Sequence, residues 1–312
     1  MKRSPLVGLA IVALVLFVAL TYWALLGRKT EDAISLEPAA PATQPASVPS
    51  GLRLTKVDGA LKLRPTGGAE RELKVGDAIA SSDEVLAGAG ASGELSLQGA
   101  SIAIGAETQV QFRGEVGDAL QFFITGGNVR ASAAATPIEF FAAGTSGRVR
   151  VQNAVARLLS DGSKGLVAYS ERGDVYVDNA GQTIVLAAGQ GTRIVAQKAP
   201  APAWKLPSSL LLKVGWPKEG ELAIRKLKLS GSVTPGALIR AQTPSGTPLR
   251  VLAAENGSFV VEIKLEEGNN DVLIQSDDVL GNREVAKHRI KVDTTPAEVG
   301  VETSPDMWKK RP

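Results

Sequence analysis

The chain has 312 residues and a formal net charge of +3, and no segment carries a strong excess of basic residues, so we expect no nucleic-acid partner. It has no cysteine, which excludes disulfides, thiolate metal ligands and cysteine nucleophiles. Its single histidine leaves the usual metal sites and histidine-dependent triads short of their ligands or base. We therefore expect no enzymatic activity, no cofactor and no metal site.

Residues 6–27 form a continuous apolar run of 22 residues. At about 1.5 Å per residue, a helix of this length crosses a hydrocarbon core of roughly 30 Å. Two basic residues precede the run and two follow it, so the positive-inside rule narrowly places residues 1–5 in the cytoplasm. We predict an uncleaved transmembrane signal anchor, with a cleaved signal peptide as the alternative. The chain is then a single-pass protein of the inner (cytoplasmic) membrane, with its C-terminal portion periplasmic or extracytoplasmic.

Residues 28–50 are predicted to be a linker. Prolines at positions 38, 41, 45 and 49 stand among Ala, Ser and Thr. Such a segment buries too little apolar surface to fold, and proline stiffens it toward polyproline II. We expect a semi-rigid spacer that holds the next domain away from the bilayer.

Residues 51–198 consist of short apolar runs of about 4 to 8 residues, separated by Gly, Asp, Asn or Pro. This spacing predicts an all-β domain rather than alternating strands and helices. The stretch 73–112 shows the pattern best, because its glycines recur where a reversing chain needs a positive φ. The pair Gly126 and Gly127 is likewise interpreted as a turn, since no helix and no Lys-Ser/Thr pair follows to form a phosphate loop.

The same region carries a family resemblance. Its motif residues are Val75, Gly76, Asp77, Asp83, Val85, Gly93, Leu95, Leu97, Ser101, Ile102 and Ile104. In these residues the chain resembles the FecR domain, named for the periplasmic regulator of ferric citrate uptake, and the resemblance continues at 120–129 and 185–190. It departs from the family pattern at 98–101 and 143–146. The resemblance implies a multi-strand β domain, and in some family members the relay of a receptor signal to a sigma factor.

Residues 199–209 are rich in Pro and Ala and are predicted to be a second linker. Residues 210–295 contain about seven strand-like runs, and the length of this region is close to that of an immunoglobulin-like sandwich. Asn256 and Gly257, between two apolar runs, predict a hairpin turn. Residues 296–312 have little periodicity and are predicted to be a disordered tail.

The second β region also resembles a known group, the bacterial Ig-like repeats of surface proteins. The matching segments are 229–236, 257–259, 265–269, 278–282 and 292–293. The resemblance implies an Ig-like β-sandwich. The predicted fold class is therefore all-β, with a FecR-like domain and an Ig-like sandwich behind one N-terminal transmembrane helix.

Arg148 and Arg150 are the candidate ligand contacts. They share one face of a predicted strand, where two guanidinium groups can grip a carboxylate or phosphate. The alternative interpretation is an exposed polar strand face.

Two further features are interpreted as structural. The densest acidic cluster includes Asp271, Asp277 and Asp278, but it lacks the spacing of an EF-hand and is interpreted as a solvated sandwich edge, with calcium as the alternative. His288 lies on a strand face with Ala286 and Ile290.

We conclude from the sequence that the chain displays two β modules outside the inner membrane, without catalytic activity. The expected partner is an envelope protein or polymer. The alternative is a FecR-type, sigma-factor-linked signalling regulator. Because only about five residues would lie in the cytoplasm, such a regulator would have to act through another membrane protein.

Overall fold

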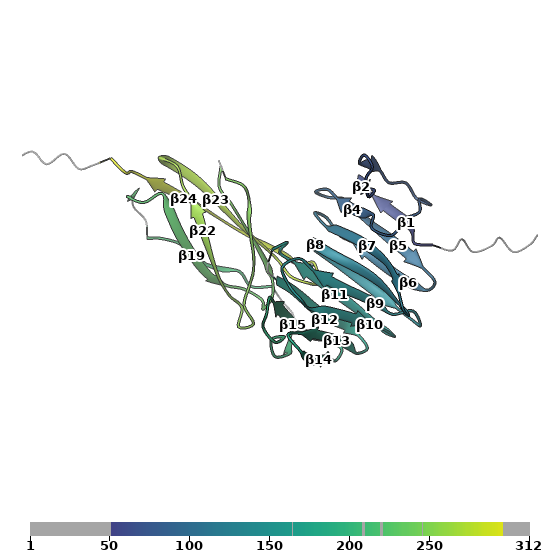
Figure 1. Cartoon of the computed structure of the whole chain (residues 1–312). Coiled ribbons are helices and arrows are strands. Elements are labelled where there is room, and N and C mark those ends of the chain that lie inside the picture. Colours follow the sequence, from purple (N-terminus) through teal and green to yellow (C-terminus); the bar gives the residue numbers. More distant parts are fainter. Residues whose placement is uncertain (1–50, 164, 208–209, 219–220, 245, 296–312) are drawn as a thin grey trace, which may run out of the picture. The chain divides into compact units, whose positions relative to one another are not determined.

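The computed structural model describes residues 51–163, 165–207, 210–218, 221–244 and 246–295 (Figure 1). Every named element in these residues is a β-strand, which confirms the all-β class. No helix among them is long and apolar enough to cross a membrane. The predicted anchor, first linker and C-terminal tail lie outside the described residues, and they stay predictions.

The first sixteen strands cover the predicted FecR-like region and part of the second predicted linker. They are β1 (Arg53–Asp58), β2 (Leu61–Arg64), β3 (Arg71–Glu72), β4 (Glu84–Ala87), β5 (Ser92–Leu97), β6 (Ala100–Ile104), β7 (Gln109–Val116), β8 (Ala119–Ala133), β9 (Ile138–Ala142), β10 (Arg148–Val151), β11 (Ala154–Ser160), β12 (Gly165–Arg172), β13 (Val175–Asn179), β14 (Gln182–Leu186), β15 (Gln190–Val195) and β16 (Trp204–Lys205).

These strands form one hydrogen-bonded network in two parts, joined by β8. Sheet A has the order β1-β5-β6-β8-β11-β12-β15-β16, and sheet B has the order β3-β2-β4-β7-β8-β9-β10-β13-β14. The N-terminal part of β8 pairs with β7 and β9, and its C-terminal part pairs with β6 and β11. All pairings are antiparallel except that of β8 with β9. β8 is thus a member of both sheets.

The inward faces of the two sheets share one hydrophobic core. At its centre, neighbouring strands of sheet B contribute Phe112, Phe122 and Phe140, with ring centroids 5.1 and 5.6 Å apart. The rings of Phe122 and Phe140 are fully buried. Burying one such side chain contributes about 1.5–3 kcal/mol, so this stack fixes β8 between β7 and β9.

Gly126 and Gly127 lie inside β8, so the prediction that they form a turn is wrong. A register shift in the pairing with β7 leaves Thr125 as an extra residue immediately before them, as in a β-bulge. Gly127 has φ +98°, and a Cβ added there would collide with Oγ1 and Cα of Thr108. The glycines therefore let the strand pass from one sheet to the other, where a side chain would not fit.

Gly127→Ala is expected to lower the free energy of unfolding by about 2–4 kcal/mol, because strain at positive φ adds to the collision with Thr108. Gly117→Ala is the matched control, since Gly117 has φ +65° but nothing within 4 Å of an added Cβ. We expect a loss of about 1 kcal/mol in the control. Urea unfolding followed by circular dichroism measures both, and equal losses would contradict the proposed close approach.

The remaining strands form a second pair of sheets. They are β17 (Lys213–Gly215), β18 (Glu221–Leu222), β19 (Lys226–Ser232), β20 (Leu238–Gln242), β21 (Leu249–Leu252), β22 (Ser258–Lys264), β23 (Gly268–Asp277) and β24 (Arg283–Val292). Sheet C has the order β17-β19-β22, and sheet D has the order β18-β24-β23-β20-β21. Both sheets contribute to a second hydrophobic core. The relation of this unit to the Ig-like repeats stays a prediction.

The turn predicted at Asn256 and Gly257 is present, but the predicted hairpin is wrong. Gly257 has φ +79° and donates a hydrogen bond to the carbonyl of Ala254 at 2.9 Å. β21 before the turn pairs with β20 in sheet D, whereas β22 after it pairs with β19 in sheet C. Turn chemistry fixes where the chain reverses, and packing of the two sheets decides the partner of each strand.

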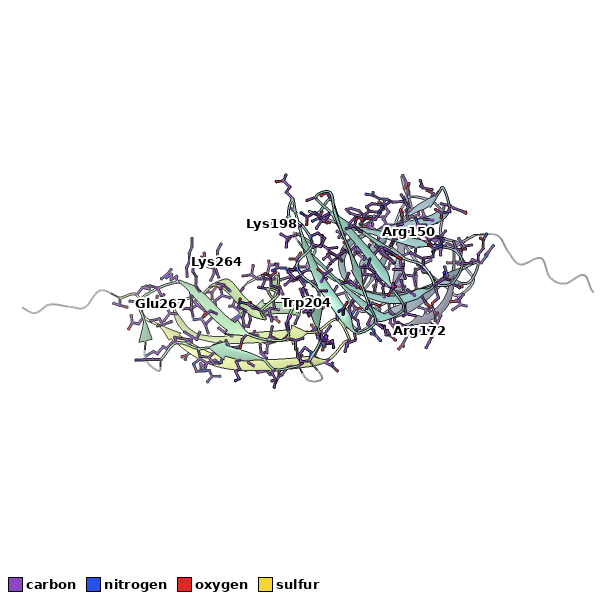
Figure 2. The ribbon with its side chains drawn as sticks, turned by 90° about the horizontal axis from the view of Figure 1, so that it is seen from below. Arg150, Arg172, Lys198, Trp204, Lys264 and Glu267 are labelled. Carbon is purple, nitrogen blue, oxygen red and sulfur yellow. The ribbon has the colours of Figure 1, made fainter. Side chains whose placement is uncertain are left out.

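β16 lies within the second predicted linker and pairs with β15 at the edge of sheet A. Contacts group the described residues into one compact unit. Within it, Trp204 of β16 (Figure 2) packs on a cluster of buried side chains formed by Leu159 and Val167 of sheet A and by Leu238 and Leu252 of sheet D.

An ion-pair triad lies on the outer face of sheet A. Glu171 accepts hydrogen bonds at 2.9 Å from Arg130 and from Arg157. The bonds from Arg130 lower the pKa of Glu171 most, partial burial opposes them, and Arg157 lowers it further, to about 2.

The stabilising effect of Glu171 is expected to disappear in acid. Because its folded pKa lies below the unfolded value of 4.5, this contribution is fully present above about pH 5 and is lost as the pH falls toward 2. The difference in melting temperature between the wild type and Glu171→Gln should therefore shrink across this range. A difference that stays constant from pH 6 to pH 2 would contradict the assignment.

Candidate functional site

The outer face of sheet B presents a continuous row of side chains across eight adjacent strands. Each member is half-buried or exposed and is the cross-strand neighbour of the next. This long row consists, from β2 to β14, of Arg64, Glu84, Gln111, Phe123, Phe141, Arg148, Asp178 and Thr183. At about 4.8 Å between strands it extends over roughly 34 Å.

A second, short row lies beside it on the same face. It consists of Gln121, Glu139, Arg150, Tyr176 and Val185, on β8, β9, β10, β13 and β14. Tyr176 and Val185 are 43% and 48% exposed. Alternation along each strand places these residues outward, because their neighbours in sequence fill the core.

Arg148 and Arg150 come together on this face, as the strand pattern predicted, and both bind carboxylates of the chain (Figure 2 labels Arg150). Arg148 donates two hydrogen bonds to Asp178 Oδ2, at 3.0 and 2.8 Å. Arg150 donates to Glu139 Oε1 at 3.0 Å and to Asp118 Oδ2 at 2.9 Å. Arg148 also reaches Glu139 at 3.4 Å. Their contact with an external ligand stays a prediction.

Hydrogen bonds favour the charged forms of Arg150 and Asp178. Partial burial lowers the pKa of Arg150, but its hydrogen bonds to Glu139 and Asp118 outweigh burial and raise it. Burial raises the pKa of Asp178, but the hydrogen bonds from Thr183 and Arg148 lower it overall. Arg150 and Asp178 therefore carry opposite charges at neutral pH.

Sequence reasoning missed the aromatic part of the face. The guanidinium carbon of Arg113 on β7 lies 4.4 Å from the ring centre of Phe123 and 5.7 Å from that of Phe141. Such cation–π contacts are worth about 0.5–1 kcal/mol at exposed sites. The alternation of β7 and β8 could have placed each side chain outward, but it could not bring the three strands together.

This face carries charges of both signs. Its basic residues include Lys62, Arg64, Arg113, Arg148 and Arg150, and its acidic residues include Glu70, Glu72, Glu84, Asp118, Glu139 and Asp178. A surface on which basic and acidic side chains alternate does not select strongly charged polymers by long-range attraction. Its chemistry suits a large partner that touches many strands.

Arg150→Met is expected to destabilise the fold by about 1–3 kcal/mol, because it removes a charged partner from the Glu139 carboxylate, whose side chain is only 5% exposed. After this change only Arg148, at 3.4 Å, still pairs with Glu139. Adding Glu139→Gln removes this poorly compensated buried charge and should restore part of the loss. A double-mutant cycle by chemical denaturation measures this coupling. Additive effects would show that the pair makes no net contribution.

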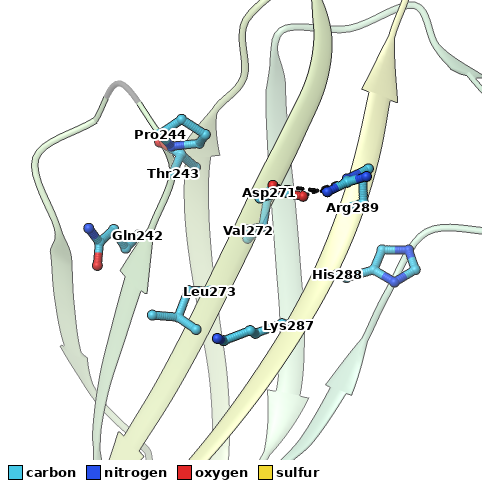
Figure 3. Close-up of a pocket in the computed structure, with 9 residues that line it drawn as sticks. All are labelled: Gln242, Thr243, Pro244, Asp271, Val272, Leu273, Lys287, His288 and Arg289. Carbon is cyan, nitrogen blue, oxygen red and sulfur yellow. Dashed lines mark hydrogen bonds and ion pairs between the residues drawn. The ribbon is translucent and has the colours of Figure 1, made fainter.

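The acidic cluster considered for calcium is used in contacts within the chain. Asp271 pairs with Arg289 at 2.7 Å beside a shallow hollow of about 660 Å³ on sheet D (Figure 3). Asp277 pairs with Arg240 and Arg283. Asp278 accepts hydrogen bonds from the backbone of its own turn at 2.8 and 2.9 Å. Among the described residues, no group of three potential ligands is placed to hold a metal.

The histidine lies where the strand pattern predicted. His288 shares a face of β24 with Ala286 and the buried Ile290, and its ring stacks on Trp216 with centroids 5.0 Å apart. The His288 ring therefore covers Trp216, which packs against the second hydrophobic core.

No protein-family model matches the chain, and no curated protein is similar to it at a significant level. Two crystal structures of a "putative anti-sigma factor" from Parabacteroides distasonis align with TM-scores of 0.34 and identities of 13% and 12%, over 39% of this chain and 59% of theirs. A tetra-tandem repeat from the extending region of a large adhesion protein aligns with a TM-score of 0.24 and 9% identity, over 79% of this chain and 94% of that one.

These alignments define no shared function. The aligned part spans less than two thirds of the Parabacteroides protein, and both TM-scores are well below 0.5. Membership of the FecR family stays a prediction from the sequence motif.

Proposed function

We propose that the chain is a non-catalytic, membrane-anchored protein of the bacterial envelope, which binds an envelope protein or polymer through the outer face of sheet B. In this proposal the N-terminal helix anchors the chain in the inner membrane. The FecR-like and Ig-like modules then lie on the periplasmic or extracytoplasmic side.

One observation carries the binding proposal: the long row crosses eight adjacent strands of one sheet. Its charged members are held by ion pairs such as Arg64–Glu84 at 2.7 Å and Arg148–Asp178 at 2.8 Å. Side chains fixed in this way lose little conformational entropy when a partner binds. Aromatic and arginine side chains are also the residue types that dominate binding energy at protein interfaces.

Tyr176→Glu is expected to weaken partner capture at least about tenfold, because it places a charge at an exposed aromatic position of the short row, between Arg150 and Val185. Val116→Glu is the matched control, since Val116 is 54% exposed but lies at the end of β7 outside both rows. The full chain in detergent is used to capture partners from envelope extracts, and the captured components are quantified by mass spectrometry and glycan analysis.

Equal capture by both variants, or no component enriched by the wild type, would contradict the proposal. The identity of the captured component also separates it from the alternative. A regulator linked to a sigma factor would retain a membrane protein with a cytoplasmic domain.

A further inference from the structure

β14 is the last strand of sheet B, and no described strand pairs with its outer side. It is joined to β13 by Ala180 and Gly181, whose φ values of +49° and +76° define a two-residue type I′ turn. Asn179 and Gln182 face each other across this turn. In such a hairpin, alternate residues bond inward, so Thr183 and Val185 direct their N–H and C=O groups away from β13.

β14 lacks the features that normally protect an exposed edge. Edge strands usually carry a charged residue, a proline or a bulge that prevents pairing with another chain. The sequence of β14 is Gln-Thr-Ile-Val-Leu, and its register with β13 is unbroken over five pairs. The exposed residues that follow it, Ala187 and Ala188, are also small and uncharged.

The other edge strands make the contrast clear. Among the described strands, β1, β3, β16, β17, β18, β21 and β22 also end a sheet, and each of them has at least one charged residue. At the opposite end of sheet B, β3 consists only of Arg71 and Glu72. β14 is the uncharged exception in this set.

We propose that β14 pairs antiparallel with β14 of a second copy of the chain, about a two-fold axis at Ile184. This register sets Thr183 of each copy opposite Val185 of the other. The two outward-facing residues of each strand then form hydrogen-bonded pairs, with four main-chain hydrogen bonds across the axis. The face of sheet B, with Thr183 and Val185, continues from one copy into the other.

The uncharged edge of β14 suits pairing with the identical strand of a second copy. A two-fold contact at Ile184 brings identical residues of the two copies close together near the axis, so a single charge there would lie close to the same charge of the other copy. None is present between residues 179 and 189. Beyond the strand ends the same register brings Ala180 near Ala188 and Gly181 near Ala187, and these small residues allow close approach of the two backbones.

The contact is small, so its affinity is expected to be modest. A pair of five-residue strands buries less than the roughly 1,200 Å² typical of stable interfaces. Tethering both copies to one membrane would raise their effective concentration, as it does for any linked pair. A covalent trap is therefore the most sensitive test.

The chain has no cysteine, so an introduced thiol is the only one in each copy and no native cysteine interferes. We design two single variants of the full chain, Thr183→Cys and Val185→Cys, both at exposed positions. Opposed residues in a hydrogen-bonded antiparallel pair have Cα atoms about 5.5 Å apart, within the range for a disulfide. A 1:1 mixture of the two variants, treated with a copper–phenanthroline oxidant, should give a disulfide dimer on non-reducing gels.

The mixture is expected to cross-link at least about tenfold faster than either variant alone, because identical positions lie diagonally, further apart. Val116→Cys mixed with Val185→Cys is the control for random collision. Equal rates in the mixture and the control would overturn the proposal. Cross-linking that is fastest within Thr183→Cys alone would also overturn it, because that result requires another register.

A second measurement needs no cysteine. Val185→Lys adds the missing charge to the edge and should shift the full chain in detergent toward the monomer in sedimentation velocity. Val116→Lys, an equal change at an exposed position away from the edge, should leave the distribution unchanged. A wild type that stays monomeric at every concentration, or an equal effect of both lysines, would overturn the proposed pairing.

Discussion

The described N-terminal strands depend on one constraint, the passage of β8 from sheet B to sheet A. The strand pairs on both sides along its length, so its first half positions β7 and β9 and its second half positions β6 and β11. Gly127 makes the passage possible, and the Phe112–Phe122–Phe140 stack fixes the first half. The long row on the outer face is continuous because Phe123 of β8 pairs with Gln111 of β7 on one side and with Phe141 of β9 on the other.

Much of the fold could be predicted from local patterns, since alternating apolar and polar residues, with glycines between the runs, mark most strands correctly. The errors share a cause. Gly126 and Gly127 have the composition of a turn, and Asn256 and Gly257 have that of a hairpin, yet the first pair continues a strand and the second joins two sheets. Pairing partners are chosen by long-range packing, and neither local propensity nor turn chemistry contains that information.

In the candidate site, too, the pattern along one strand was predictable, but the contacts between strands were not. Alternation along one strand was enough to put Arg148 and Arg150 on one face. Their carboxylate partners come from other strands, with Glu139 on β9 and Asp178 on β13, so only the sheet order reveals that the arginines are already paired. Arg113 was missed because it lies at a register shift between β7 and β8, and because its second ring, Phe141, comes from β9, so alternation along one strand shows neither contact.

The unprotected edge of β14 and the charged edge of β3 have different consequences for assembly. A strand that pairs about a two-fold axis uses the same edge in both copies. One contact therefore covers the β14 edge of each copy, and no further copy can add there, so the assembly stops at a dimer. If β3 were equally open, sheet B could add copies at both ends and grow into a fibre. Arg71 and Glu72 at that end oppose such growth. An uncharged edge at one end and a charged edge at the other is therefore the arrangement that permits a dimer while preventing aggregation.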